Sequence, residues 1–223
     1  MPDPSEVLVD IIRRSAVSGV APDLDRVIEV GCGDGAVLEM LAERKPRILV
    51  GVDIKMCDWS PLITHHSPLT TFHIIGNIGW LPIKSKTFDA VVCVNVYNSI
   101  TALEAENGIF ELIRIARRGG AVVIGIQNVF NPLLWLRVSW RKFRQGRRAN
   151  PVVFSLKQIG RLAKRAGGRI AKVEKISPPP LYYPRNMLWR AVRRCIANIY
   201  YYALSRHFRF VAVYNVFVEK CKL

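Results

Sequence analysis

The sequence predicts an α/β fold built on a doubly wound, mainly parallel sheet, and two observations carry this prediction. Short apolar runs that suit buried strands alternate with segments of helical periodicity through residues 26–127. The first two runs are joined by a turn with glycines at 31, 33 and 35 and by a helix. Strands buried on both faces carry continuous apolar residues, which is the pattern of a parallel sheet covered by helices.

The elements follow one another in a regular order. A helix over residues 5–17, capped by Ser5, directs Arg13 and Arg14 outward. Residues 27–30 predict a buried strand, and the glycine turn leads from it into a helix at 36–44 that Pro46 ends. The second strand, residues 48–52, ends on Asp53. Residues 55–68 are predicted to be irregular, and residues 71–75 form the third strand.

The second half of the predicted sheet contains four further strands. Residues 87–94 and 121–127 predict the fourth and fifth, separated by a helix at 101–118. A helix capped by Ser155 runs to Ala166 and is closed by Gly167-Gly168. Strands at 169–176 and 208–219 complete the sheet.

The glycine turn and Asp53 predict a site for a cofactor that contains a nucleoside. Glycine adopts positive φ and lets ligand atoms approach the backbone where a Cβ would clash. A carboxylate at the end of the next strand accepts hydrogen bonds from ribose hydroxyls. Gly31-x-Gly33-x-x-Ala36 also satisfies the dinucleotide-binding fingerprint. Glu29 favours another cofactor, because an acid two residues before the first glycine repels a pyrophosphate but can bind an ammonium group.

Residues 26–55 resemble the first two motifs of the class I S-adenosylmethionine (SAM)-dependent methyltransferases, in particular the type 11-like group. Residues 76–83 and 88–93 resemble that family's adenine-contacting loop and fourth strand, and residues 111–120 resemble the helix and Gly-Gly turn before its fifth strand. The resemblance implies SAM as the cofactor. SAM carries an ammonium group and a sulfonium and has no phosphate, which agrees with the position of Glu29.

The resemblance also implies a strand order and a set of cofactor ligands. The expected sheet has seven strands in the order 3-2-1-4-5-7-6, with strand 7 antiparallel, helices on both faces, and extra basic amphipathic helices after strand 5 and between strands 6 and 7. The cofactor-binding residues that it implies are Glu29, Gly31, Cys32, Gly33, Gly35, Asp53, Ile54, Asn77, Ile78 and Asn95.

The chain departs from the family pattern at two places. Asn77 stands where the family usually has Asp, and Arg117-Arg118-Gly119-Gly120 stands where it usually has Lys-Pro-Gly-Gly. Asn77 still offers an amide oxygen to the adenine amino group. The first departure therefore bears on affinity more than on function.

The catalytic candidates follow the fourth strand. Because the carboxyl ends of parallel strands line the ligand crevice, Tyr97 and Asn98 should face the transferred methyl group, beside Asn95. In the family, transfer is a direct displacement in which orientation supplies much of the catalysis, and the sequence identifies no general base. The Asn-Pro-Pro-Tyr motif of amino-directed nucleic-acid methyltransferases is absent here, which disfavours methylation of base amino groups.

A metal site and a disulfide framework are both disfavoured. His65 and His66 are adjacent in sequence and have no Cys or acid at ligand spacing. The five cysteines form no Cys-x-x-Cys pair and are odd in number, which favours a reducing cytoplasm. Acidic residues near the amino end argue against a signal peptide.

The net charge of +16 is unevenly distributed along the chain. Residues 1–130 contain 12 Lys and Arg against 15 Asp and Glu, whereas residues 131–223 contain 21 against 2. We expect residues 1–223 to form one SAM-methyltransferase domain. In it, residues 1–130 are the cofactor-binding core, and residues 131–223 are a basic, aromatic-rich part that faces the substrate or a partner and completes the sheet.

Residues 131–144 and 186–205 predict two amphipathic helices in which arginines flank Leu, Ile, Trp and Tyr. Such helices suit packing on the sheet, RNA binding, or attachment to an anionic membrane surface. The longest uncharged run here, Cys195–Ser205, has eleven residues and is too short to span a bilayer.

Large apolar residues interleave with the basic ones, which favours a hydrophobic or lipid-linked acceptor and peripheral contact with an anionic membrane at its inner face. A tRNA or rRNA methyltransferase is the alternative. A non-catalytic SAM-binding module is the second alternative.

Overall fold

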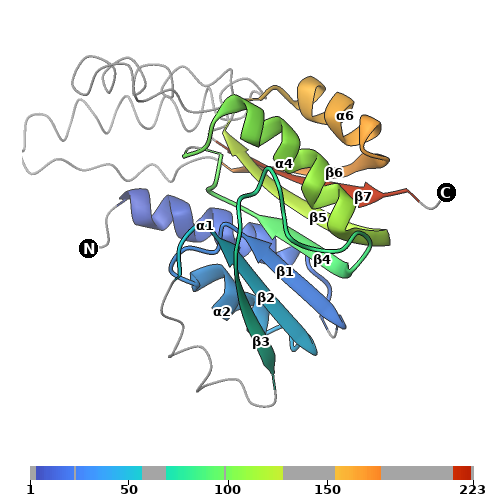
Figure 1. Ribbon diagram of the computed structural model, residues 1–223. Coiled ribbons are helices and arrows are strands. Elements are labelled where there is room, and N and C mark those ends of the chain that lie inside the picture. The colour runs from blue at the N-terminus through green and yellow to red at the C-terminus, as the bar shows by residue number, and fades with distance from the viewer. Residues whose placement is uncertain are drawn as a thin grey trace, which may run out of the picture.

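The computed structural model describes residues 4–22, 24–56, 69–97, 99–127, 154–176 and 213–221. These residues form a seven-stranded sheet in the order β3-β2-β1-β4-β5-β7-β6 (Figure 1). The strands are β1 (Arg26–Val30), β2 (Ile48–Asp53), β3 (Thr70–Ile75), β4 (Phe88–Cys93), β5 (Ala116–Gln127), β6 (Gly168–Ile176) and β7 (Val213–Lys220). The helices in the described part are α1 (Pro4–Ser18), α2 (Ala36–Ala42), α4 (Ala102–Ile115) and α6 (Leu156–Arg165).

The predicted strand order and the antiparallel last strand are confirmed. β1 pairs in parallel with β2 and β4, and the parallel set continues through β3 and β5. β7 lies between β5 and β6 and is antiparallel to both. Part of the basic half of the chain therefore completes the sheet that the first half begins.

Helices cover both faces of the sheet, as the continuous apolar strands predict (Figure 1). Val27 packs in a cluster with residues of α1 and α2, whereas its neighbour Ile28 packs in a second cluster with residues of α4 and α6. Successive residues of a strand point to opposite faces. Each buried strand must therefore be apolar at every position, and this is why it looks continuous in the sequence.

A buried polar contact ties α1 to the far end of the sheet. Asn215 on β7 is fully buried, and its Nδ2 donates hydrogen bonds to the carbonyl oxygen of Ile12 (2.9 Å) and to Oγ of Ser15 (2.8 Å). Ser15 in turn donates to Oε2 of Glu174 on β6 at 2.5 Å. Buried polar groups are costly unless they are paired, so these bonds fix the position of α1 over the sheet.

Two predicted helix boundaries are wrong. α1 already begins at Pro4, so Ser5 lies inside the helix and does not cap it; proline is well suited to a first helical turn. α4 ends at Ile115 and not at Arg118, because Ala116 is extended (φ −64°, ψ 140°) and opens β5 opposite Phe88. The amine of Lys220 donates to the carbonyl oxygens of Arg114 and Ala116, which stabilises this early end.

Two further boundaries differ, because α2 ends at Ala42, two residues before the predicted end, and β5 begins at Ala116, five residues before the predicted start. The boundaries of α6 agree with the sequence. Ser155 caps α6 in a reciprocal capping box with Gln158, and Gly167 closes the helix with φ +80°. The predicted helices at 131–144 and 186–205, and most of the irregular segment at 55–68, lie outside the described residues.

Candidate functional site

The glycine turn and Asp53 meet at the carboxyl edge of the sheet. β1 and β2 run in parallel with Val30 opposite Val52, so the residues that follow both strands lie side by side. The amides of Gly31 and Cys32 donate to the carbonyl oxygen of Val52 at 2.7 and 3.1 Å. The amide of Gly33 donates to Oδ2 of Asp53 at 2.9 Å. Asp53 therefore holds the turn in place besides offering oxygens to a ligand.

The three glycines of the turn all have positive φ, but for different reasons. Gly31 (φ +81°) lies under β4's carboxyl end, and a Cβ there would come within 2.0 Å of Cγ2 of Val96. Gly35 (φ +80°) is the N-cap of α2. A Cβ on Gly33 (φ +47°) would meet nothing within 4 Å. Gly31 is thus required by packing within the protein, whereas Gly33 borders open space above the turn.

Glu29 is a buried acid directly beneath this turn. It is 2% exposed, and its Oε2 has no hydrogen-bond partner among the described residues. Burial raises the pKa of Glu29 well above its usual range, and the nearby carboxylates of Asp34 and Asp53 add to that effect. The charge of Arg13 and a backbone hydrogen bond from Leu38 oppose it. A buried carboxyl with one unpartnered oxygen suits a cationic ligand group such as an ammonium.

Arg13 does not point outward as the sequence predicts. Its guanidinium Nη2 lies 3.2 Å from Oδ1 of Asp34 on the glycine turn, and its side chain is 25% exposed. Arg14 does point outward, where it pairs with Asp10 one turn earlier in α1. The sequence gives no signal for the first contact, because it joins a helix to a turn about twenty residues away.

The loop after β3 shows why Asn77 replaces the family's usual acid. Nδ2 of Asn77 donates to Oε1 of Glu104 at 2.7 Å, and Gly79 donates its amide to Oδ1 of Asn77 at 2.8 Å. Glu104 also accepts from the amide and hydroxyl of Thr101 at the start of α4. An Asp at position 77 would have no proton to donate to Glu104 at neutral pH. Asn77 therefore stabilises the loop, and its contact with Glu104 favours Asn over Asp at this position. No short-range sequence pattern marks Glu104 as its partner.

The apolar members of the predicted cofactor set occupy different environments. Ile54 follows Asp53 and is 64% exposed, so it offers open apolar surface next to the expected ribose position. Ile78 is 5% exposed and packs close to Gly108 of α4, where a Cβ would lie 2.9 Å from its Cγ1. Ile78 is therefore a core residue that supports the loop. Cys32 and Cys93 are buried, and burial raises the pKa of the Cys93 thiol far above its usual range.

The segment after β4 differs from the prediction. Asn95 adopts a left-handed conformation (φ +63°), which Asn tolerates better than most residues, and turns the chain at the open edge. The sequence predicts that Tyr97 faces the transferred methyl group, but its side chain is 1% exposed and packs edge-to-face on Phe154 with ring centroids 6.1 Å apart. Burial raises the pKa of Tyr97 well above 10, which disfavours it as a base. Asn98 lies outside the described residues.

Comparison with known proteins shows which family a segment of the chain is similar to. A family profile described as a methyltransferase domain matches residues 28–124, the segment from β1 to the middle of β5. Residues 28–124, less than half of the chain, therefore match the class I SAM-dependent methyltransferases. An uncharacterised protein of Methanocaldococcus jannaschii is 22% identical to it over 176 residues, which are 78% of this chain and 61% of that protein. The chain thus spans less than two thirds of the length of that relative.

Solved structures share the fold of this chain. A putative methyltransferase of Haloferax volcanii, solved in complex with the Trm112 methyltransferase activator, has a TM-score of 0.69 at 16% identity; the match covers 94% of this chain and 88% of that one. The magnesium protoporphyrin IX methyltransferase of Synechocystis, solved with bound SAH, has a TM-score of 0.62 at 15% identity over 96% of this chain and 82% of that one. These likenesses establish the fold.

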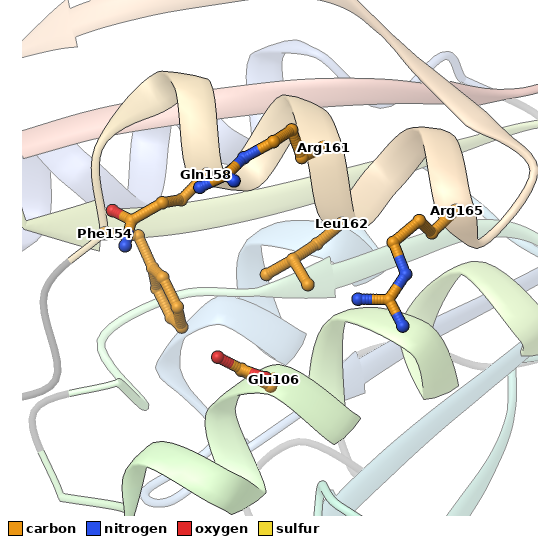
Figure 2. A pocket seen from close by; sticks show the side chains of 6 residues that line it. All are labelled: Glu106, Phe154, Gln158, Arg161, Leu162 and Arg165. Atoms are coloured by element: carbon orange, nitrogen blue, oxygen red, sulfur yellow. The ribbon is translucent and has the colours of Figure 1, made fainter.

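The structure also has a pocket that none of the glycines of the turn lines (Figure 2). A cavity of about 230 Å³ lies between α4 and α6, lined by Glu106, Phe154, Gln158, Arg161, Leu162 and Arg165. Arg165 reaches from α6 toward α4 and lies over the ring of Phe110, 5.4 Å from its centroid. Phe154 forms part of this lining and also contacts Tyr97, so the hollow adjoins the segment after β4.

Metal and membrane-spanning features are absent from the part of the chain that the structure describes. No group of three or more His, Cys, Asp or Glu side chains there could hold a metal ion. His65 and His66 fall outside it. None of its helices combines the length and apolar character needed to cross a bilayer.

Proposed function

We propose that the protein transfers the methyl group of SAM to a hydrophobic or lipid-linked acceptor at the inner surface of an anionic membrane. SAM as the cofactor is supported by one observation: Glu29, Gly33 and Asp53 lie at the carboxyl edge of the sheet. SAM supplies an activated methyl on its sulfonium. Glu29 would receive the ammonium, Asp53 the ribose hydroxyls, and the open space above Gly33 the body of the cofactor.

In this proposal the protein contributes mainly position. Alignment of two reactants in a site that excludes water is worth up to about 7–11 kcal/mol in favourable systems. Tyr97, in the segment after β4, is buried and packs edge-to-face on the buried Phe154, so the two rings form a packed floor at this point. Such a floor supports orientation of an acceptor and needs no dedicated base from the protein.

The acceptor half of the proposal rests on the separation of charge along the chain. Residues 131–223 contain 21 Lys and Arg against 2 Asp and Glu. In the described portion of this half, α6 presents Lys157, Arg161 and Lys164 to solvent. Basic side chains near large apolar ones bind anionic lipid surfaces through both charge and insertion. The aromatic residues that would insert, including Trp135 and Trp140, fall outside the described residues.

A liposome experiment tests the membrane part. The protein should sediment with vesicles of phosphatidylglycerol and phosphatidylcholine and much less with pure phosphatidylcholine. High salt should weaken binding without abolishing it, because inserted apolar surface is not screened. Replacing Trp135 and Trp140 by Ser should abolish sedimentation, whereas the matched replacement of Lys157 and Lys164 by Gln should only weaken it.

RNA methylation remains the alternative, favoured by the same excess of basic residues. If RNA is the partner, affinity should fall linearly on a log–log plot against salt concentration, with arginines such as Arg141 and Arg144 contributing to the slope. Tritiated-methyl transfer from SAM into separated lipid and RNA extracts decides between the two. Label in RNA alone would overturn the lipid proposal. Bound SAM without transfer to either extract would favour the second alternative, a non-catalytic SAM-binding module.

We further propose an activator protein as a partner, because a protein of similar fold is solved with Trm112. β3 is an end strand of the sheet, and its Phe72 and Ile75 are 51% and 58% exposed. An exposed apolar edge strand favours pairing with a strand of another chain. Purified Trm112 should form a complex that Phe72→Asp with Ile75→Asp abolishes and Thr70→Asp does not. Failure of the wild-type protein to form that complex, or indifference to the double variant, would count against this partner.

A further inference from the structure

Arg13 reaches from α1 to the loop that begins α2 and borders the proposed cofactor site. Its Nη2 lies 3.2 and 3.4 Å from the two carboxylate oxygens of Asp34. The backbone around Arg13 is fixed, because Asn215 of β7 holds the carbonyl of Ile12 and the hydroxyl of Ser15 on either side of it. The segment of α1 that carries Arg13 is thus held in place by contacts that do not involve Asp34.

The surroundings of Arg13 suggest what it binds. Burial raises the pKa of Glu29, and the positive charge of Arg13 opposes that effect, so the two side chains are electrostatically coupled. The Oε2 of Glu29, which has no hydrogen-bond partner among the described residues, and the guanidinium of Arg13 therefore offer one acidic and one positive group near the turn. A ligand group that satisfies both must carry an ammonium and a carboxylate close together.

We propose that Arg13 binds the carboxylate of the methionine part of SAM while Glu29 binds its ammonium. This inference rests on the proposed assignment of the glycine turn as the SAM site. The amino-acid end of SAM carries both charges on one carbon atom. Guanidinium groups bind carboxylates through two parallel hydrogen bonds. In this structure the guanidinium of Arg13 contacts the carboxylate of Asp34, so there is room for a carboxylate beside it.

The Arg13–Asp34 pair by itself does not explain the position of Arg13. Asp34 is 68% exposed, and exposed ion pairs contribute little to stability. Removing the guanidinium should therefore leave unfolding almost unchanged, whereas it should alter recognition of one chemical group on the ligand. These two effects are separable by experiment.

The test compares two ligands that differ only in the carboxylate: S-adenosylhomocysteine and its decarboxylated analogue, S-adenosyl-3-thiopropylamine. Calorimetry on the full chain should show that Arg13→Gln weakens binding of S-adenosylhomocysteine by roughly 10- to 150-fold, the range for a hydrogen bond to a charged group. Binding of the decarboxylated analogue should change by less than threefold. Arg14→Gln is the matched control, because it removes the same charge from the outward-facing neighbour and should change neither affinity.

Each other result overturns the inference in a distinguishable way. Equal loss of both ligands in Arg13→Gln would mean that Arg13 supports the site without touching the carboxylate. No loss of either would mean that the residue forms only a surface ion pair. Arg13→Lys, which retains the charge, should recover part of the preference for the carboxylate. If the wild-type protein binds neither ligand, the assignment of the SAM site fails first.

Discussion

Replacing Glu29 by Gln tests how this buried acid affects the stability of the fold and how it affects ligand binding. The side chain is 2% exposed and its Oε2 has no hydrogen-bond partner among the described residues. Gln has the same shape but no charge. The substitution should therefore leave packing intact while removing both the titration of the group and its attraction for a ligand ammonium.

The effect on stability depends on pH, and its sign follows from the raised pKa. Burial raises the pKa of Glu29 well above 4.5, so the unfolded chain releases this proton at lower pH than the folded protein does. The stability that the neutral form contributes is complete below the unfolded pKa of about 4.3. It is lost as pH rises through the folded pKa, at up to about 1.4 kcal/mol per pH unit. Glu29→Gln should thus match the wild type near pH 4 and exceed it at pH 8.

Ligand binding should change in the opposite direction. An ammonium group favours ionised Glu29, so binding of S-adenosylhomocysteine should release a proton from the wild-type protein at pH values below the raised pKa. Glu29→Gln should bind about 1.5–3 kcal/mol more weakly, the range for a hydrogen bond to a charged group. It should release no proton from this site. The variant is therefore expected to be more stable and less able to bind.

Urea unfolding at several pH values measures the first effect, and calorimetry in two buffers of different ionisation enthalpy measures the second. Glu39→Gln is the control, because Glu39 is exposed on α2 and loses the same charge. A stability difference that does not vary with pH would refute the protonated state of Glu29. Unchanged affinity for S-adenosylhomocysteine in Glu29→Gln would refute its role as the ammonium ligand.

Three further sets of substitutions test the site and its supports. Asp53→Ala should weaken S-adenosylhomocysteine binding by about 1.5–3 kcal/mol. Gly33→Val should abolish this binding, because a Val side chain is strained at φ +47° and enters the open space above the turn. Normal calorimetric binding by either folded variant would remove that residue from the site. Asn77→Asp restores the family's usual residue, yet it should lower the free energy of unfolding in urea at pH 7 by about 1–3 kcal/mol, because the new carboxylate repels Glu104. Adding Glu104→Gln should restore the lost stability. A loss that persists in the double variant would contradict repulsion as the cause. Asn215→Ala should cost about 1–3 kcal/mol in the same assay by removing both bonds to α1, and a cost below about 0.5 kcal/mol would show that the tether is dispensable.

The local chemistry of the site was predictable because its signals are short in sequence. Gly31, Gly33 and Gly35 have positive φ, as a turn of this kind requires. Asp53 reaches the turn because parallel pairing aligns the ends of β1 and β2. The capping box of α6 likewise depends on residues three apart, Ser155 and Gln158.

The environment of individual side chains was less predictable. Tyr97 stands at a strand end, where many side chains face the ligand crevice, yet its ring lies in the core because Phe154 packs on it from the other half of the chain. At the end of α4, the carbonyl oxygens of Arg114 and Ala116 accept hydrogen bonds from Lys220, more than a hundred residues later. From the sequence, Asn77 looks like a weaker cofactor ligand than the family's usual Asp. The structure shows that its amide donates a hydrogen bond to Glu104.

The sequence alone was enough to predict most of the strands, the glycine turn and the capping of α6, because strand periodicity, positive φ and helix capping act over a few neighbouring residues. The order of the strands followed from the resemblance to the methyltransferase family. The three-dimensional structure was needed to see that Arg13 faces the turn and that Asn215 holds α1 in place. It was also needed to see that Oε2 of Glu29 has no partner among the described residues and that burial raises the pKa of this acid. Charge–charge contacts and burial arise between segments that are distant in the chain. Their strength depends on the surrounding medium and on the distance between atoms, and the fold alone sets both.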